Sequence, residues 1–199
     1  MDIKQILIIH GGNTFANHSD YIDYIKNSEV DKTRLYSTIE WKQTISDKLG
    51  LNYEVLNPRM PNASYARYNE WKLYFEAVTK VLDNNVILIG HSLGGIFLAK
   101  YLSENKFPKI IDALFLLAAP FEKNGDTLGD FKLSYNFSKL NKQVKKIYIL
   151  HSEDDPVVPI TDSDKYSSAL PSAELVIFHD KGHFNTEEFS GLVYLIKDL

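Results

Sequence analysis

The sequence of 199 residues contains no cysteine. Disulfide bonds, thiolate metal sites and a cysteine nucleophile are therefore excluded, and a chain without disulfides fits a reducing compartment. Long hydrophobic runs are also missing, since none approaches the roughly 18 apolar residues of a membrane-spanning helix. The N-terminal run Ile6-Leu7-Ile8-Ile9 is too short for a signal-peptide core, and no basic segment or cleavage site surrounds it. We therefore expect a cytoplasmic protein with no membrane span.

Basic residues are too few and too scattered for a surface that binds polyanions. Lysine and arginine number 22 against 26 aspartates and glutamates, which gives a formal net charge of -4. The densest basic cluster, Lys142, Lys145 and Lys146, is typical of a solvated surface, whereas nucleic-acid binding concentrates cations on one face. We therefore expect no nucleic-acid partner.

The histidines show no metal-binding pattern. His18, His151 and His179 lack the spacing to Asp, Glu or another His that metal sites use. His10 and His91 adjoin the motifs described below, and we expect them to position backbone or loops. The sequence therefore predicts no metal site and no cofactor.

Apolar residues are plentiful, at 44% hydrophobic and 13% aromatic, so a chain of this length can fill the core of a single domain spanning residues 1–199. Short apolar runs recur, and most lack apolar/polar alternation, as strands covered on both faces do. Segments with helical spacing separate them, such as Trp41, Ile45 and Leu49 ahead of Gly50. The predicted strands are residues 6–9, 53–56, 86–89, 113–118, 147–150 and 175–178.

This alternation predicts an α/β fold with three layers, built on a doubly wound and mostly parallel sheet of about six strands. Ligands bind such sheets outside the carboxyl ends of the strands, so the loops that follow the strands should share one rim. Residues 13–36 receive no element and could form a lid, a binding loop or irregular surface. Only 26 residues separate Ala119 from Lys146, which leaves no room for a large cap domain.

The segment Gly90-His91-Ser92-Leu93-Gly94 matches G-x-S-x-G, between a predicted strand and a predicted helix. That context is the one a nucleophile elbow requires, because the serine must occupy a tight, strained turn to present its hydroxyl above the sheet. Glycines two positions to either side avoid collisions with the neighbouring strand and helix. The alternative is a glycine-rich helix start with an incidental serine. We predict Ser92 as a nucleophile.

A serine hydroxyl needs a base, and the base needs an orienting acid. His183 follows the last predicted strand and is our candidate base. Asp154 and Asp155 both follow the strand at 147–150; the D-x-x-V-P pattern beginning at Asp155 resembles the acid loop of many serine hydrolases, whereas Asp154 could brace the turn. The chain order Ser92, Asp155, His183 is that of the α/β-hydrolase fold.

Acyl transfer also needs donors for the developing oxyanion. The backbone N–H of Leu93 is one candidate, and Gly12 in the loop after the first strand is the other, although Gly11 or Asn13 could serve. Aromatic side chains near the same rim could line an apolar acyl pocket or pack into the core. These are Phe15, Tyr21, Tyr24, Phe121 and Phe184.

The chain resembles the α/β-hydrolase superfamily in four stretches. These are Ile8-Ile9-His10-Gly11, the nucleophile elbow at residues 90–94, residues 154–159, and Gly182-His183-Phe184. Within that superfamily, the chain resembles the small serine hydrolase family that includes retinoblastoma-binding protein nine and the bacterial YdeN type. The resemblance implies a small fold without a cap, catalytic roles for Ser92, Asp155 and His183, and esterase or peptidase-like activity. The pocket-protein-binding motif L-x-C-x-E cannot occur in this chain, because it has no cysteine.

We therefore expect a carboxylesterase-like serine hydrolase that acts on a small-molecule acyl substrate through an acyl-enzyme. The bond cleaved is a carboxylic ester, with a thioester or an amide as possible variants. Two alternatives use the same sequence features: a binding or regulatory protein on a hydrolase fold, and an acyltransferase with the same three residues. The physiological substrate and the oligomeric state are not predicted.

Overall fold

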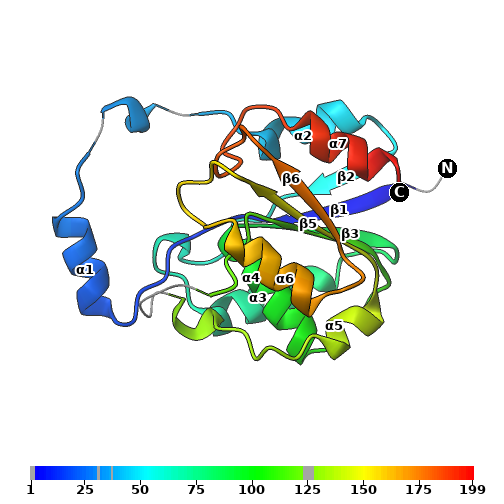
Figure 1. Ribbon diagram of the computed structural model, residues 1–199, viewed down its shortest axis with the longest axis horizontal. Helices are drawn as coiled ribbons and strands as arrows, with labels where there is room; N and C mark the ends of the chain where they lie inside the picture. Colours follow the sequence, from blue (N-terminus) through cyan, green and yellow to red (C-terminus); the bar gives the residue numbers. More distant parts are fainter. Residues whose placement is uncertain (1–2, 31, 37, 123–127) are drawn as a thin grey trace.

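Six parallel strands form one sheet in the order β2-β1-β3-β4-β5-β6 (Figure 1). The computed structural model describes residues 3–30, 32–36, 38–122 and 128–199. The predicted α/β fold with a doubly wound sheet is confirmed, and each predicted strand is present, the second with the predicted bounds and the others with one or both ends shifted. The strands are β1 (Lys4–Ile9), β2 (Tyr53–Leu56), β3 (Val86–His91), β4 (Ile111–Leu117), β5 (Val144–Ser152) and β6 (Glu174–Phe178).

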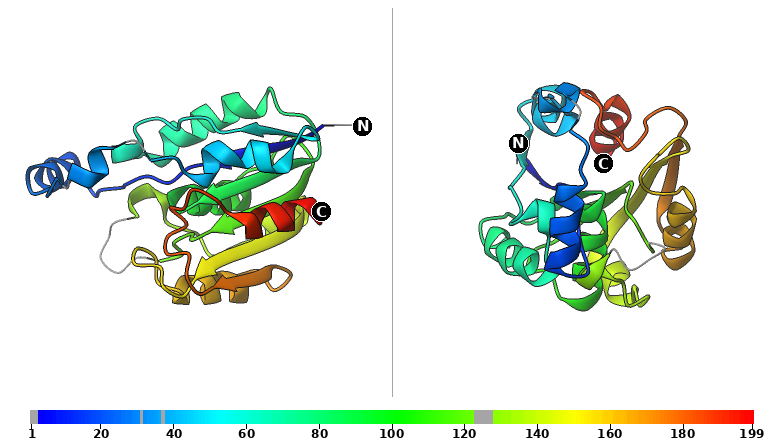
Figure 2. Two further views of the ribbon diagram at one scale, coloured as in Figure 1. Left: turned by 90° about the horizontal axis from the view of Figure 1, so that it is seen from above. Right: turned by 90° about the vertical axis from the view of Figure 1, so that its left-hand side faces the viewer.

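Helices cover both faces of the sheet and make three layers (Figures 1 and 2). In β3, Leu88 packs into the larger core, whereas Ile87 and Ile89 pack into the core on the opposite face. Both faces of the strand are therefore buried, which explains its continuous apolar run. One face carries α2 (Trp41–Leu49) and α7 (Ser190–Lys197); the other carries α3 (Tyr68–Thr79), α4 (Leu93–Glu104), α5 (Ser138–Gln143) and α6 (Thr161–Ala169).

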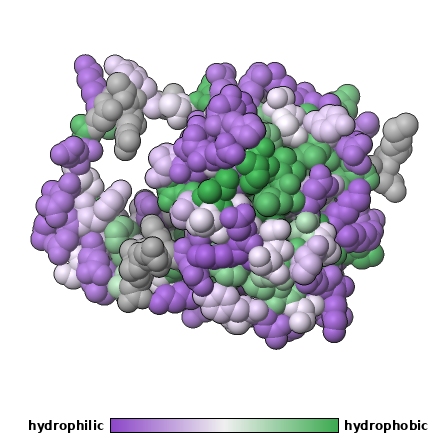
Figure 3. Space-filling model, viewed as in Figure 1, coloured by the Kyte–Doolittle hydropathy of each residue, from purple (hydrophilic) through white to green (hydrophobic). Residues whose placement is uncertain are grey.

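The segment without a predicted element forms an arm that extends past the carboxyl ends of the strands (Figure 2). It contains α1 (His18–Lys26), whose N-cap Asn17 accepts a hydrogen bond from the backbone N–H of Asp20, and a 3-10 helix at Lys32–Leu35. No residue of α1 is buried, and an opening separates part of the arm from the body (Figure 3). The base of the arm is held by aromatic contacts, with Phe15 packed against Tyr65.

No large cap domain occurs among the described residues. Between β4 and β5 the chain forms a 3-10 helix at Gly129–Phe131 and the short helix α5, and both pack on the body. A further 3-10 helix, Ala63–Tyr65, lies between β2 and α3. Within the described ranges, no helix is both long and apolar enough to cross a bilayer.

Candidate active site

Ser92 occupies a sharp turn between β3 and α4, with φ 55° and ψ -121°. A non-glycine residue at positive φ is strained, and the turn is held by a hydrogen bond from the Ser92 N–H to the Leu117 carbonyl at 2.8 Å. The flanking glycines allow backbone to touch backbone: a Cβ on Gly94 would lie 2.1 Å from the Ile9 carbonyl oxygen, and one on Gly90 2.6 Å from the Cα of Gly95. The strand and helix can meet at this turn only without those side chains.

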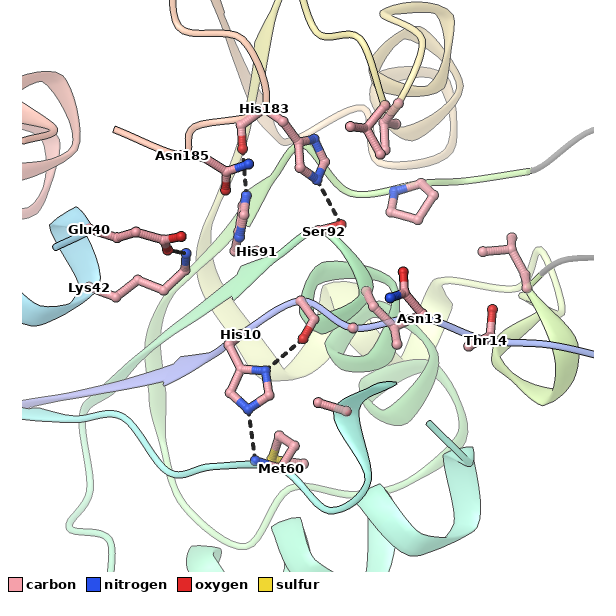
Figure 4. A pocket seen from close by; sticks show the side chains of 18 of the residues that line it. His10, Asn13, Thr14, Glu40, Lys42, Met60, His91, Ser92, His183 and Asn185 are labelled. Carbon is pink, nitrogen blue, oxygen red and sulfur yellow. Dashed lines mark hydrogen bonds and ion pairs between the residues drawn. The ribbon is translucent and has the colours of Figure 1, made fainter. Parts of the chain in front are cut away.

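Ser92, His183 and Asp155 lie in one hydrogen-bonded line. Nε2 of His183 is 2.9 Å from Oγ of Ser92, and Nδ1 is 2.8 Å and 3.1 Å from the two carboxylate oxygens of Asp155 (Figure 4). The three residues follow β3, β5 and β6 at the common rim. A carboxylate beside Nδ1 fixes the proton there, which leaves the Nε2 lone pair facing the serine hydroxyl.

The Asp155 carboxylate is buried but well supplied with donors. Its side chain is 0% exposed, and the backbone N–H groups of Val157 and Val158 donate to it at 2.8 Å and 3.0 Å. Burial raises the pKa of Asp155, but the hydrogen bonds from His183 and the two amides outweigh it, and the pKa lies below its ordinary value. Asp155 is therefore ionised near neutral pH and can hold an imidazolium.

The neighbouring carboxylate of Asp154 does not bond to His183. It joins the end of β5 to the loop after β6. It accepts hydrogen bonds from the Ser152 hydroxyl and from the Gly182 N–H, the latter at 2.9 Å. Ser152 in turn accepts the Lys181 N–H at 3.0 Å. Asp154 thus braces the turn that carries His183 and makes no contact with the imidazole.

His91 holds the backbone of His183 through a hydrogen bond. Its Nε2 donates to the His183 carbonyl at 2.8 Å, and the two rings lie 5.0 Å apart. Burial, reinforced by the positive charge of Lys42, holds the pKa of His91 well below its ordinary value, so the ring is neutral. The carbonyl contact places its proton on Nε2.

His10 orients the loop that contains the predicted oxyanion donor. Its Nε2 accepts the Met60 N–H at 2.8 Å, so Nδ1 carries the proton and donates to the Gly11 carbonyl at 2.6 Å. In a trans peptide the N–H points opposite to the carbonyl, so the Gly12 N–H points away from the His10 ring. The ring and Ser92 lie on opposite sides of this loop (Figure 4). Neither this amide nor that of Leu93 is bonded to another described residue.

An open cavity of about 1090 Å³ lies over this line of residues, and Ser92, Leu93, His183 and Gly12 all border it. Of the three phenylalanines considered for an acyl pocket, only Phe15 lines the cavity.

The other two phenylalanines pack into the core, which corrects the expectation that they line the pocket. Phe184 is 0% exposed and stacks on Phe189 at 4.8 Å between ring centroids, because the chain turns at positive φ and directs its side chain beneath the sheet. Phe121 is buried against Tyr166 and Phe137. Nor do the described residues contain a cluster of three metal-ligating side chains.

A family model described as serine hydrolase matches residues 37–193. The chain belongs to the serine hydrolase family. It is 28% identical over 151 residues to serine hydrolase RBBP9 of Rattus norvegicus, covering 74% of this chain and 78% of that protein. It is 26% identical over 192 residues to the putative hydrolase YdeN of Bacillus subtilis, covering 93% and 88%. The crystal structure of the ydeN gene product shares the fold, with a TM-score of 0.72 at 19% identity over 98% of this chain and 97% of that one.

The cavity also contains charged and amide side chains that motif reasoning did not identify. Glu40 and Lys42 form an ion pair at the start of α2 and point toward the cavity (Figure 4). Asn57, Arg59 and Asn185 border the same space. They come from separate segments of the sequence, and the folded arrangement brings them to the site.

Proposed function

We propose that this serine hydrolase cleaves carboxylic esters of small acyl substrates through a covalent acyl-enzyme on Ser92. The observation that carries the proposal is the continuous hydrogen-bonded line from Asp155 through His183 to the Ser92 hydroxyl at the mouth of the cavity. A serine on a strained turn, with an imidazole nitrogen at its oxygen, is the arrangement that acyl transfer needs.

In the first half-reaction, Oγ of Ser92 bonds to the carbonyl carbon while Nε2 of His183 takes the hydroxyl proton. The carbonyl electron pair moves onto oxygen; as it returns, the bond to the leaving alcohol breaks and His183 gives the proton to that alcohol. Water then repeats the two steps on the acyl-enzyme and releases the acid. Asp155 stabilises the transient imidazolium without taking up its proton.

The Leu93 and Gly12 amides are the oxyanion donors in this proposal. Both border the cavity, both are unbonded within the described part of the chain, and the His10 contact directs the Gly12 N–H away from the His10 ring. One such donor is worth about 10²–10³ in kcat.

The test is labelling by a fluorophosphonate together with hydrolysis of a p-nitrophenyl ester series and a matched thioester. Wild type should be labelled and active, and Ser92→Ala should lose labelling and at least about 10⁴-fold in kcat. Ser103→Ala is the control, because its hydroxyl bonds only to the Ala99 carbonyl within α4. Labelling that survives in Ser92→Ala would reject the nucleophile. A wild type inert to the probe and to every substrate would favour a binding or regulatory role.

A further inference from the structure

The cavity has chemically different walls on the two sides of Ser92. The sheet order places β1 and β2 on one side of β3, and β4 and β5 on the other. The segments after β4 and β5 contribute Leu128, Val157 and Pro159 together with the carboxylates of Glu122 and Asp162. The described lining on the β2 side includes a guanidinium and amides, so the two sides present different charges to the substrate.

We call four side chains of this wall, which also includes Glu40 and Gln43, the polar corner: Lys42, Asn57, Arg59 and Asn185. Lys42 lies in the first turn of α2, which packs on β2, and Asn57 and Arg59 lie in the loop after β2, so all three lie at one corner of the rim. Asn185 reaches the same corner because the Trp41 N–H donates to the Thr186 carbonyl at 2.8 Å.

One cation among the described lining residues has no ion pair. Besides histidines, five charged residues line the cavity, and four of them take part in ion pairs, although Lys165 serves two carboxylates and leaves one negative charge beside it. Glu40 pairs with Lys42, whose side chain is 7% exposed, and Lys165 pairs with both Glu122 and Asp162. The fifth, Arg59, has no ion pair and no hydrogen bond with any described residue.

The amides of the polar corner are also unused. The side chains of Asn57 and Asn185 make no hydrogen bond within the described part of the chain, and both border the same cavity as the Arg59 guanidinium. A guanidinium carries five donors in a planar fork that matches the oxygens of a carboxylate or phosphate. A protein with net charge -4 thus presents an unpaired cation and two free amides in its substrate cavity.

We propose that the polar corner binds an anionic group, a carboxylate or a phosphate, carried by the substrate, with Arg59 as the principal contact. The inference rests on the proposed ester hydrolysis and specifies its substrate class, an ester that carries an anionic group. The Lys42–Glu40 pair contributes no net charge to this contact.

The experiment compares kcat/KM for ester pairs that differ only in charge. In the first pair, mono-p-nitrophenyl glutarate carries a carboxylate on its acyl part and p-nitrophenyl valerate does not. In the second pair, 4-acetoxybenzoate carries a carboxylate on its leaving group, and its methyl ester is the neutral member. In the third pair, 4-acetoxyphenyl phosphate carries a phosphate on its leaving group, and 4-acetoxyanisole is the neutral member. We expect wild type to prefer the anionic member of at least one pair, and the identity of that pair shows which part of the substrate the corner holds.

Arg59→Gln should lower the anionic-to-neutral ratio by about tenfold, and Arg59→Lys should retain part of it because the charge remains without the fork. Arg67→Gln is the matched control, since Arg67 lies over the Tyr65 ring and does not line the cavity; its ratio should equal that of wild type. Raised salt should weaken the preference.

Two results would overturn the inference while leaving ester hydrolysis intact: equal wild-type rates for both members of every pair, or a ratio that Arg59→Gln does not change. Loss of the proposed function would appear differently, as a wild type that neither hydrolyses neutral esters nor reacts with fluorophosphonate. Calorimetry of the Ser92→Ala protein with mono-p-nitrophenyl glutarate measures the same contact without turnover. A dissociation constant that Arg59→Gln leaves unaltered would also refute the contact.

Discussion

A histidine buried behind the site should make the stability of this protein depend on pH. His91 is 3% exposed, and its Nε2–H is committed to the His183 carbonyl. Burial holds the pKa of His91 well below its ordinary value, whereas in the unfolded chain it titrates near 6.5. Below about pH 6.5 the unfolded chain therefore binds a proton that the folded protein does not, and the free energy of unfolding falls with falling pH.

The size of the effect follows from one proton. While the folded pKa stays below the working pH, His91 costs about 1.36 kcal/mol of unfolding free energy per pH unit. Between pH 6.5 and 5.0 the loss from this residue approaches about 2 kcal/mol, and above pH 6.5 its contribution is fully present. His91→Gln retains an N–H donor for the His183 carbonyl but cannot titrate, so this part of the slope should disappear.

Urea unfolding of both proteins at pH 7.5, 6.5, 5.8 and 5.0 measures the difference directly. The wild type should lose about 2 kcal/mol more than His91→Gln between pH 6.5 and 5.0. His179→Gln is the control, because the hydrogen bond that His179 donates to Glu153 raises the pKa of this exposed residue and gives any slope the opposite sign. Parallel profiles for wild type and His91→Gln would show that His91 takes up its proton without unfolding, and would refute the reasoning.

Two further substitutions separate neighbouring roles at the site. Asp155→Asn should lower kcat on a p-nitrophenyl ester by about 10⁴, because an amide no longer holds the imidazole in the required tautomer. Asp154→Asn keeps an acceptor oxygen for the turn and should lower kcat by less than about tenfold. Similar losses of kcat for the two variants in steady-state kinetics would contradict this division of roles. His10→Ala should lower kcat by about 10- to 100-fold with little change in KM, because the Gly11 carbonyl loses its hydrogen bond and the Gly12 amide is no longer held in its direction. His10→Gln should restore part of the lost kcat. A rise in KM with kcat unchanged would exclude His10 as a positioning residue.

The sequence predicted those parts of the structure that depend on burial and on the ends of strands. The run Val86-Ile87-Leu88-Ile89 shows no alternation, because opposite faces of β3 face two cores, and this pattern alone identifies a central strand. Parallel strands bring their carboxyl ends to one rim, so residues placed after three strands were expected to meet. Ser92, Asp155 and His183 do lie in hydrogen-bond contact, whereas their catalytic roles stay predictions.

Side-chain direction in loops was not predictable in the same way. Phe184 adjoins His183, yet its ring lies in the core, because a positive φ of 54° reverses the chain between the two residues. Gly182 also has a positive φ. Nothing in the local pattern distinguishes this turn from one that would place the phenylalanine ring in the cavity. The helix in the arm was also missed: α1 has nine residues and buries none of them, so its sequence carries no indication of packing on the core.

The two kinds of site residue therefore depend on different physical constraints. The hydrogen-bonded line is tied to the sheet: Ser92 bonds to the carbonyl at the end of β4, and His183 is held by His91 at the end of β3. The sheet register determines those positions, so a loop substitution that preserves the strands should preserve the line. The polar corner instead comes from α2 and from the loops after β2 and β6, where no described residue forms an ion pair or hydrogen bond that holds the Arg59 side chain in place. Substrate preference should consequently change through Arg59 without altering the reaction at Ser92, and for that reason the charge ratio, rather than the rate itself, is the measurement that tests the corner.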